Sequence, residues 1–444
     1  MEIVRHKGLA LFGICLLSFT AFLDFTIVNT ALPFIQQAFK INIFQLQWVA
    51  NIFPIILSMT MIAVGKLADL WGRKRVFYFG VIAFGVAALC AGFSHEIDVL
   101  IFFRGLQGLG ASIVFISSTA LISETFHSQE RARAIGIYGG ITGAGLMVGP
   151  FFGGVLIGLL DWRWVFWINI PLIIIGLFCC WASLKVPSII NKKLSMDWKG
   201  LIFLILGLGF LMYGIIGVNW WCLGIGVIAL ALLLIFDLKS TSPLLDFSIF
   251  KMPLIALSLI SCALAGIVSY VFMFFDPLFL KNVLDLTPYS IGLLIAIIPA
   301  AQVVISFSFK PLLKWAGLAN LLFYSSVSAL LAAFLHLFVG VNVYLLYLLL
   351  PFALLGVNWG LSNTAMITAV NEKVALHKIG EAIGTIATIW NMVGAIFLAL
   401  STVIFHIFEP DFVSGFRSVI AFNMAFMIIV IIAAICIRRK LPAS

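Results

Sequence analysis

Long apolar runs separated by short polar loops form the pattern of this chain. A helix needs about 20 mostly apolar residues to cross the hydrocarbon core of a bilayer, and fourteen runs approach that length. They cover residues 8–30, 46–66, 76–94, 98–122, 132–157, 163–184, 198–217, 220–237, 253–280, 289–310, 317–338, 342–368, 379–407 and 416–438. The pattern predicts an all-α integral membrane protein with fourteen transmembrane helices.

The composition agrees with burial in lipid. Apolar residues make up 63% of the 444 positions and charged residues 10%, whereas soluble domains contain about 25% charged residues. The net charge of +9 is dispersed over short loops, so we expect no nucleic-acid partner. The seven cysteines lie within apolar runs and lack C-x-x-C spacing, which favours buried thiols over a metal site or a disulfide framework. Asp24, Pro33 and the length of the first run favour an uncleaved span over a signal peptide.

The basic residues indicate an orientation. An even number of spans puts both termini on one side, which we assign to the cytoplasm. Of the 26 Lys and Arg residues, 21 then lie in inner loops, four in outer loops, and Arg104 lies inside a span. Basic residues concentrate in cytoplasmic loops. The asymmetry therefore supports the span count and a bacterial cytoplasmic (inner) membrane location with both termini cytoplasmic.

Two ionisable side chains fall inside apolar runs. Asp24 lies in the first run and Arg104 in the fourth, with Gln107 on the same helix face as Arg104. Charged groups at that depth are expensive and indicate function by default. Asp24 could instead bond a neighbouring helix for packing, and Arg104 could pair statically with backbone carbonyls. We interpret Asp24 as a proton acceptor that the charge of Arg104 tunes.

The loop between the second and third runs reads GKLADLWGRKRV, residues 65–76. Gly72 supplies the permissive backbone of a tight turn. Asp69 lies four residues before Arg73, which allows a local ion pair or a carboxylate aimed at another helix. A loop that only sets topology needs neither Gly65 nor Asp69. The stretch Phe309–Gly317 is a weaker echo of this loop and fits an internal duplication.

Glycines recur every four residues along the fifth run, at 136/140, 139/143 and 145/149/153. Small residues at this spacing produce a groove in which another helix packs closely. Pro150 adds a kink. We expect this run to supply a tightly packed, flexible seam.

Five stretches resemble motifs of the major facilitator superfamily, in its fourteen-span drug:proton antiporter branch. They are LDFTIVNTALP (23–33), GKLADLWGRKRV (65–76), RGLQGLGAS (104–112), GLMVGPFFGG (145–154) and DWRWVFWINIP (161–171). The resemblance implies two six-helix bundles around a central cavity, with two additional helices between them. It also implies proton coupling through Asp24 and Arg104, a latch formed by Gly65, Asp69, Gly72 and Arg73, and an antiporter motif formed by Gly145, Gly149, Pro150, Gly153 and Gly154.

We therefore predict an N-terminal bundle at 1–184, a linker with two helices at 185–252, and a C-terminal bundle at 253–444. Polar residues within the runs are candidates for lining the cavity, although such residues also join helices. These residues are Asn29, Gln47, Asn51, Gln107, Asp276, Asn358, Ser362, Trp390 and Asn391. Asp276 is either an interfacial cap near Lys281 or a second cavity carboxylate. Lys281 stands where the family commonly has Gln, which leaves the substrate open.

The sequence contains no nucleophile elbow, Walker loop or cluster of metal ligands, so we expect neither an enzyme nor a cofactor or metal. We predict a proton-coupled antiporter that exports small amphipathic compounds by alternating access. Its partners would be small-molecule substrates, protons and the lipid bilayer, and it would be a monomer, with an envelope-spanning adaptor as a further partner. The alternatives are a dedicated exporter of an endogenous metabolite such as a siderophore, a symport importer, and a non-transporting membrane sensor.

Overall fold

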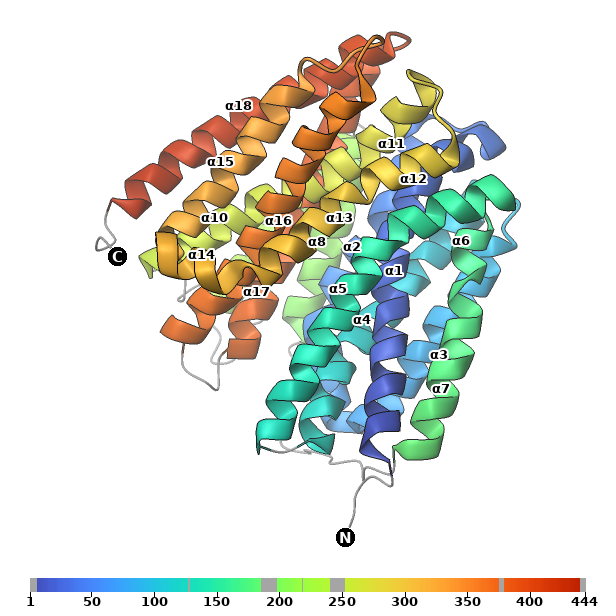
Figure 1. Cartoon of the computed structure of the whole chain (residues 1–444), viewed down its shortest axis with the longest axis vertical. Helices are drawn as coiled ribbons and strands as arrows, with labels where there is room; N and C mark the ends of the chain where they lie inside the picture. Colours follow the sequence, from blue (N-terminus) through green and yellow to red (C-terminus); the bar gives the residue numbers. More distant parts are fainter. Residues whose placement is uncertain are drawn as a thin grey trace. The chain divides into compact units, whose positions relative to one another are not determined.

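The computed structural model (Figure 1) describes residues 6–126, 128–184, 198–217, 219–239, 252–374 and 379–439. These residues are helical almost throughout, which confirms the predicted all-helical fold. They divide into two compact units, Met1–Met196 and Asp197–Ser444.

Among the described residues, the first unit contains seven helices. They are α1 (Lys7–Phe39), α2 (Ile43–Trp71), α3 (Arg73–Gly92), α4 (Ile97–Thr125), α5 (Ser128–Leu159), α6 (Trp164–Trp167) and α7 (Asn169–Ser183). Helix α1 packs against α5, α7 and α4, while α4 also packs against α2 and α3. Helix α1 carries Asp24, so this residue lies on a helix with several packing neighbours.

The second unit contains the remaining helices. They are α8 (Trp198–Ile216), α9 (Trp220–Lys239), α10 (Pro253–Ile267), the π-helix η2 (Val268–Phe272), α11 (Met273–Asn282), α12 (Pro288–Ile295), α13 (Ile297–Phe307), α14 (Phe309–Ala316), α15 (Leu318–His336), α16 (Leu345–Lys373), α17 (Ile379–Ile407) and α18 (Phe412–Arg438). Helices α8 and α9 pack against each other, and α8 also contacts α17. The core of this unit includes buried aliphatic side chains of α10, α15, α16 and α17.

Twelve helical segments in the described residues are long and apolar enough to cross a membrane. The predicted runs at 198–217 and 220–237 correspond to shorter apolar stretches, Ile202–Ile215 and Trp220–Phe236. The count of fourteen spans therefore stays a prediction, as do the three predicted domains and their bounds. The predicted spans elsewhere coincide with helices, and the tenth is broken at Ala296, between α12 and α13.

Local chemistry explains several helix ends. The Asn42 side chain accepts a hydrogen bond from the Gln45 backbone and caps α2. Asp411 caps α18, and the hydrogen bond from the Ser414 hydroxyl lowers the pKa of the Asp411 carboxyl below its ordinary value. Gly72 separates α2 from α3 at φ 92°, and Gly317 separates α14 from α15 at φ 75°. Both glycines adopt backbone angles that side chains disfavour, so the two related loops share this feature.

Candidate functional site

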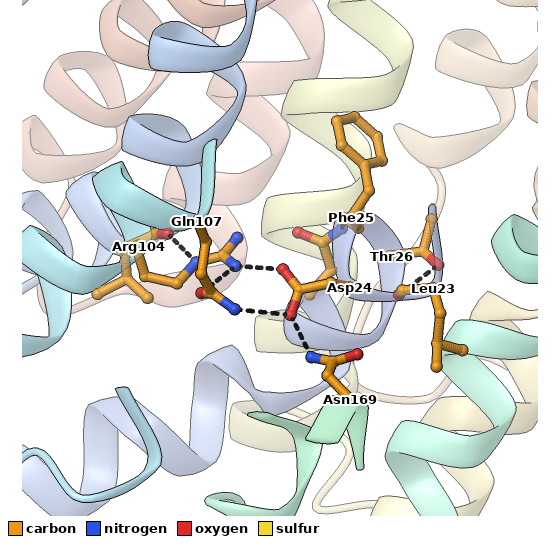
Figure 2. A network of polar contacts seen from close by, with 9 residues as sticks. Leu23, Asp24, Phe25, Thr26, Arg104, Gln107 and Asn169 are labelled. Atoms are coloured by element: carbon orange, nitrogen blue, oxygen red, sulfur yellow. Dashed lines mark hydrogen bonds and ion pairs between the residues drawn. The ribbon is translucent and has the colours of Figure 1, made fainter. Parts of the chain in front are cut away.

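Asp24 lies at the centre of a buried polar cluster formed by α1, α4 and α7 (Figure 2). Arg104 donates from Nη1 to Asp24 Oδ2 at 2.6 Å. Gln107 and Asn169 donate from their side-chain amides to Asp24 Oδ1 at 3.2 and 2.8 Å. The structure thus brings together Asp24, Arg104 and Gln107, which the sequence singled out, and adds Asn169 as a third donor.

The cluster is sealed from solvent. Asp24 is 0% exposed and Arg104 is 2% exposed. The Arg104 guanidinium also lies 4.6 Å from the centre of the Phe53 ring and donates from Nε to the Val49 carbonyl at 3.4 Å. A buried ion pair needs such additional contacts, because desolvation of two charges otherwise exceeds their mutual attraction. Aromatic and backbone contacts therefore help to hold the cation in place.

The pattern of donors describes the protonation state of the cluster. All three side chains that contact the Asp24 carboxyl group do so through N–H groups, so both oxygens act as acceptors. An ionised carboxylate accepts only, whereas a protonated one must also donate. Arg104 also donates to Gln107 Oε1 at 3.0 Å, which orients the amide so that its nitrogen faces Asp24. The geometry is that of an ionised aspartate held by one cation and two amides.

The opposite face of α1 is joined to α5. Pro150 has no backbone N–H, so it cannot bond the carbonyl of Leu146 one turn earlier. The Thr26 hydroxyl donates to that carbonyl at 3.1 Å, and Thr30 donates to the Pro150 carbonyl at 3.4 Å. Two threonines close to Asp24 therefore satisfy backbone groups at the proline of the predicted antiporter motif.

Three glycines of α5 let α1 approach closely. A Cβ added at Gly145 would lie 2.8 Å from the Phe19 carbonyl oxygen, and one at Gly153 would lie 3.0 Å from that of Ile27. At Gly149 it would collide with the Thr26 hydroxyl. These three positions agree with the predicted close packing of this helix. Among described residues, no atom comes within 4 Å of a Cβ built at Gly136, Gly139, Gly140 or Gly143.

The predicted latch is partly described. Arg73 opens α3 and pairs with Glu124 near the end of α4, with 3.0 Å between Nη1 and Oε1. Glu124 was not predicted, because nothing in its sequence context distinguishes it from other carboxylates at helix ends. The side chain of Asp69 lies outside the described residues. Gly65 is half-buried, and a Cβ there would lie 3.7 Å from the Ile116 side chain.

The candidate lining residues differ in their surroundings. Gln47 and Asn51 on α2 are fully buried, and none of their four side-chain N and O atoms has a hydrogen-bond partner among the described residues. Asn29 is half-buried and donates to the Phe25 carbonyl of its own helix at 3.3 Å. Buried polar atoms are usually paired, so the α2 pair identifies groups that remain available to a polar ligand.

The other lining candidates lie in the second unit. Asn358 donates to the Ser325 carbonyl at 2.9 Å and joins α16 to α15. Ser362 donates to the Trp359 carbonyl of its own helix at 3.1 Å. On α17, Asn391 accepts from the Tyr270 hydroxyl at 2.6 Å, and the half-buried Trp390 packs edge-on against the same tyrosine ring. These contacts favour helix joining for Asn358, whereas the Ser362 hydroxyl bonds within its own helix.

Asp276 does not cap a helix at the interface. Its side chain is 2% exposed, and its Oδ2 lies 3.5 Å from Nε2 of His336. Lys281 instead pairs with Asp285, with 2.6 Å between Nζ and Oδ1. The interfacial alternative is therefore wrong. Sequence reasoning missed His336 because it occurs at the end of an apolar run without a recognisable motif.

No group of three or more His, Cys, Asp or Glu side chains within the described ranges could hold a metal ion. The family model of the Major Facilitator Superfamily matches residues 14–399 of the chain. The chain belongs to the major facilitator superfamily. This match confirms the family that the five motifs predicted.

Curated relatives of the chain include several named for drug resistance. Multidrug resistance protein Stp of Mycobacterium tuberculosis (strain CDC 1551 / Oshkosh) is 32% identical over 68% of this chain and 58% of its own length. The puromycin resistance protein pur8 of Streptomyces alboniger is 28% identical over 85% of this chain and 78% of its own. The riboflavin transporter RibZ of Clostridioides difficile (strain 630) is 29% identical over 68% and 67%. The chain thus spans less than two thirds of Stp.

Solved structures show the same fold at low identity. A peptide transporter POT in complex with sulfate gives a TM-score of 0.71 at 14% identity, covering 97% of this chain and 95% of the other. A variant of the nucleoside transporter NupG also gives 0.71 at 14% identity, covering 97% of this chain and all of the other. These similarities support the fold of a superfamily member, and the specific chemistry must come from the site itself.

Proposed function

We propose that the protein is a proton-coupled antiporter that exports small amphipathic compounds by alternating access. The observation that carries the proposal is the Asp24 carboxylate, which is fully buried and held by Arg104, Gln107 and Asn169. Intramembrane carboxylates of this kind mark proton and ion pathways. The curated relatives named for drug resistance, multidrug resistance for Stp and puromycin resistance for pur8, support export as the direction.

Protonation of Asp24 competes directly with its bonds to the three donors. A proton on either oxygen removes the negative charge and converts one acceptor site into a donor. Arg104 then loses its counter-ion while still buried, a state that costs several kcal/mol, on the order of 3–5. The protonated protein is therefore driven to rearrange until the guanidinium finds water or another acceptor. Proton binding is linked to conformational change in this way.

The remaining parts complete the transport cycle. Arg73 and Glu124 would close the cytoplasmic side in one state, together with the predicted contribution of Asp69. Gln47 and Asn51 supply buried polar groups for a substrate, and apolar and aromatic contacts supply most of the binding. We propose a monomer in the bacterial inner membrane, with fourteen spans, both termini in the cytoplasm and an envelope-spanning adaptor as a possible partner.

A second candidate function is dedicated export of one metabolite. The similarity to the riboflavin transporter RibZ favours it, because that relative is named for a single small molecule. Both functions use the same Asp24 site, so they differ only in the substrate. Two other functions have less support. The α5 motif that resembles antiporters argues against symport import, and the buried charge pair argues against a non-transporting sensor.

The experiment that tests the proposal measures substrate-induced proton release in inside-out vesicles. The challenge panel contains lipophilic cations, neutral antibiotics and culture extract. Wild type is compared with Asp24→Asn, and Asp285→Asn serves as the matched control because Asp285 is an exposed carboxylate. We expect release in wild type and in the control, and its loss in Asp24→Asn.

Each other outcome has a definite meaning. Release that persists in Asp24→Asn contradicts coupling through this residue. A response to culture extract but to no drug identifies a dedicated metabolite exporter. Substrate uptake driven by protons in right-side-out vesicles would replace antiport by symport. Binding without any proton movement would favour a sensor.

A further inference from the structure

We propose that Asp276 and His336 form a second proton-binding site, in which the two side chains hold one shared proton inside the second unit. Asp276 lies on α11 and His336 at the end of α15, and neither residue follows from a motif. The site concerns groups that the Asp24 mechanism does not use. It takes a proton as its ligand and requires no transported compound, so it stands independently of the proposed function.

The tautomer of His336 follows from its hydrogen bond. Its Nδ1 lies 2.7 Å from the Ala332 carbonyl oxygen, one turn earlier on α15. A carbonyl oxygen can only accept, so Nδ1 must carry a hydrogen. The other ring nitrogen, Nε2, faces the carboxyl group of Asp276 at 3.5 Å. The ring is thus fixed in an orientation that presents one nitrogen to the acid.

The two facing atoms need a proton between them. Nε2 of His336 and Oδ2 of Asp276 are buried, face each other at 3.5 Å and have no hydrogen-bond partner among the described residues. If both groups were deprotonated here, a nitrogen lone pair would face a carboxylate oxygen, and the site would carry an unpaired negative charge. An isolated charge is very expensive to bury. One added proton places a hydrogen between the two atoms and removes the net negative charge.

That proton can lie on either of the two facing atoms. On Nε2 it makes an imidazolium–carboxylate pair, and on Oδ2 it makes a neutral histidine and a neutral carboxylic acid. Transfer between them breaks the N–H bond, forms the O–H bond and cancels both charges. The net charge is zero in either arrangement, which is the state that burial favours. Burial therefore favours the pair with one proton over the pair with none or with two.

Aromatic rings shield the pair. His336 is 1% exposed, and the rings of Phe272, Phe352 and Phe416 have centroids 4.7, 5.8 and 6.4 Å from its imidazole. Phe272 and Asp276 are four residues apart and therefore share a helix face. The rings exclude water, and their faces tolerate a cation. Exchange of the proton consequently requires this cage to open.

The backbone around Asp276 is irregular. The π-helix η2 ends at Phe272, four residues before Asp276, and Pro277 directly follows Asp276. Segments of π-helix occur frequently at functional sites, and proline removes a backbone donor from the helix. Both features occur within one turn of Asp276. They set this part of the span apart from an ordinary packing helix.

Other titratable groups on the packed elements have their own contacts or lie far along their helices. Four of them donate hydrogen bonds: Arg417 to the Val339 carbonyl, Tyr347 to the Leu335 carbonyl, Tyr270 to Asn391 and Cys262 to the Ser362 carbonyl. Two others form ion pairs, Lys281 with Asp285 and His406 with Glu409. Tyr289 is exposed on α12. The remaining titratable residues belong to α14 or to the C-terminal ends of α16 and α18. They are Lys310, Lys314, Glu372, Lys373, Cys436 and Arg438. The proton is therefore assigned to Asp276 and His336 alone.

The test uses the full-length protein in lipid nanodiscs, with the proton as the probe. Nitrogen NMR of ¹⁵N-histidine reports the protonation of each ring nitrogen, and infrared spectroscopy reports protonated carboxylic acids. His336→Gln identifies the His336 signals. The spectra are recorded at neutral pH.

We expect wild type to show either an imidazolium signal of His336 or a carboxylic-acid band of Asp276 at neutral pH. Asp276→Asn should leave a neutral His336 with its single proton on Nδ1, so the site loses one proton. Asp285→Asn should change neither signal, because that acid is exposed and paired with Lys281.

Two results would overturn the proposal. One is a wild-type protein in which His336 is neutral and Asp276 shows no acid band at neutral pH. The other is a wild-type protein that shows a full imidazolium signal of His336 and a full acid band of Asp276 together, which means two protons instead of one. Both are read on wild type, so the proposal remains decidable if Asp276→Asn does not fold. Loss of drug-induced proton release through Asp24 would leave this site intact, which separates its failure from failure of the proposed function.

Discussion

The Asp24–Arg104 pair allows a quantitative prediction from a double-mutant cycle. Asp24→Asn leaves the Arg104 guanidinium 2% exposed without a counter-ion. Removing one partner of a buried pair costs about 3–5 kcal/mol, and Arg104→Gln leaves the opposite charge uncompensated at a similar cost. The double variant contains no charge at this position. We expect it to be no less stable than either single variant, which corresponds to a coupling free energy of about 3 kcal/mol or more.

The assay is equilibrium unfolding of detergent-solubilised protein by sodium dodecyl sulfate. The control cycle uses Lys281 and Asp285, whose N–O distance is also 2.6 Å but whose side chains are 20% and 87% exposed. Exposed pairs four residues apart contribute about 0.3–0.5 kcal/mol, so the control coupling should be several times smaller. Free energies at Asp24 and Arg104 that add within about 0.5 kcal/mol would refute the reasoning, because the guanidinium would then not depend on the carboxylate.

Two glycine substitutions test backbone geometry by the same unfolding assay. Gly149→Ala places a methyl group against Thr26 and should cost about 1–3 kcal/mol, whereas Gly143→Ala, with open space around it, should be neutral or stabilise by up to about 1 kcal/mol. Equal effects at the two positions would disprove a close contact between α1 and α5. Gly72→Ala should cost on the order of 1–3 kcal/mol because φ is 92° there. An unchanged midpoint would show that this turn relaxes.

The sequence was most informative where the chemistry of one residue differs from that of its neighbours in the chain. A charged group within an apolar run must find a partner, so Asp24 and Arg104 were predicted to act together and lie 2.6 Å apart. Gly72 was predicted to form a tight turn, and its positive φ confirms that expectation. In both cases one physical rule applies to one or two residues and needs no knowledge of the neighbouring helices.

Contacts that depend on helix packing were not predictable. Asn169, Glu124 and His336 are separated from their partners by 145, 51 and 60 positions in the chain, and no local pattern indicates which helices meet. The regular glycines of α5 illustrate the same limit. Their spacing is uniform, yet the described residues show a close neighbour at Gly145, Gly149 and Gly153 and none within 4 Å at Gly136 or Gly139. Spacing shows that a helix can be approached, and tertiary structure decides where.

The two faces of α1 have different mechanical properties. Toward α4 and α7 its polar contacts converge on the Asp24 carboxylate, so a change in the charge of that one group would weaken them together. Toward α5 they consist of threonine hydroxyls and glycine contacts whose strength does not depend on charge. Helices α1 and α5 would then move as one rigid body. The contacts of Asp24 would hold that body to the rest of the first unit until they are broken.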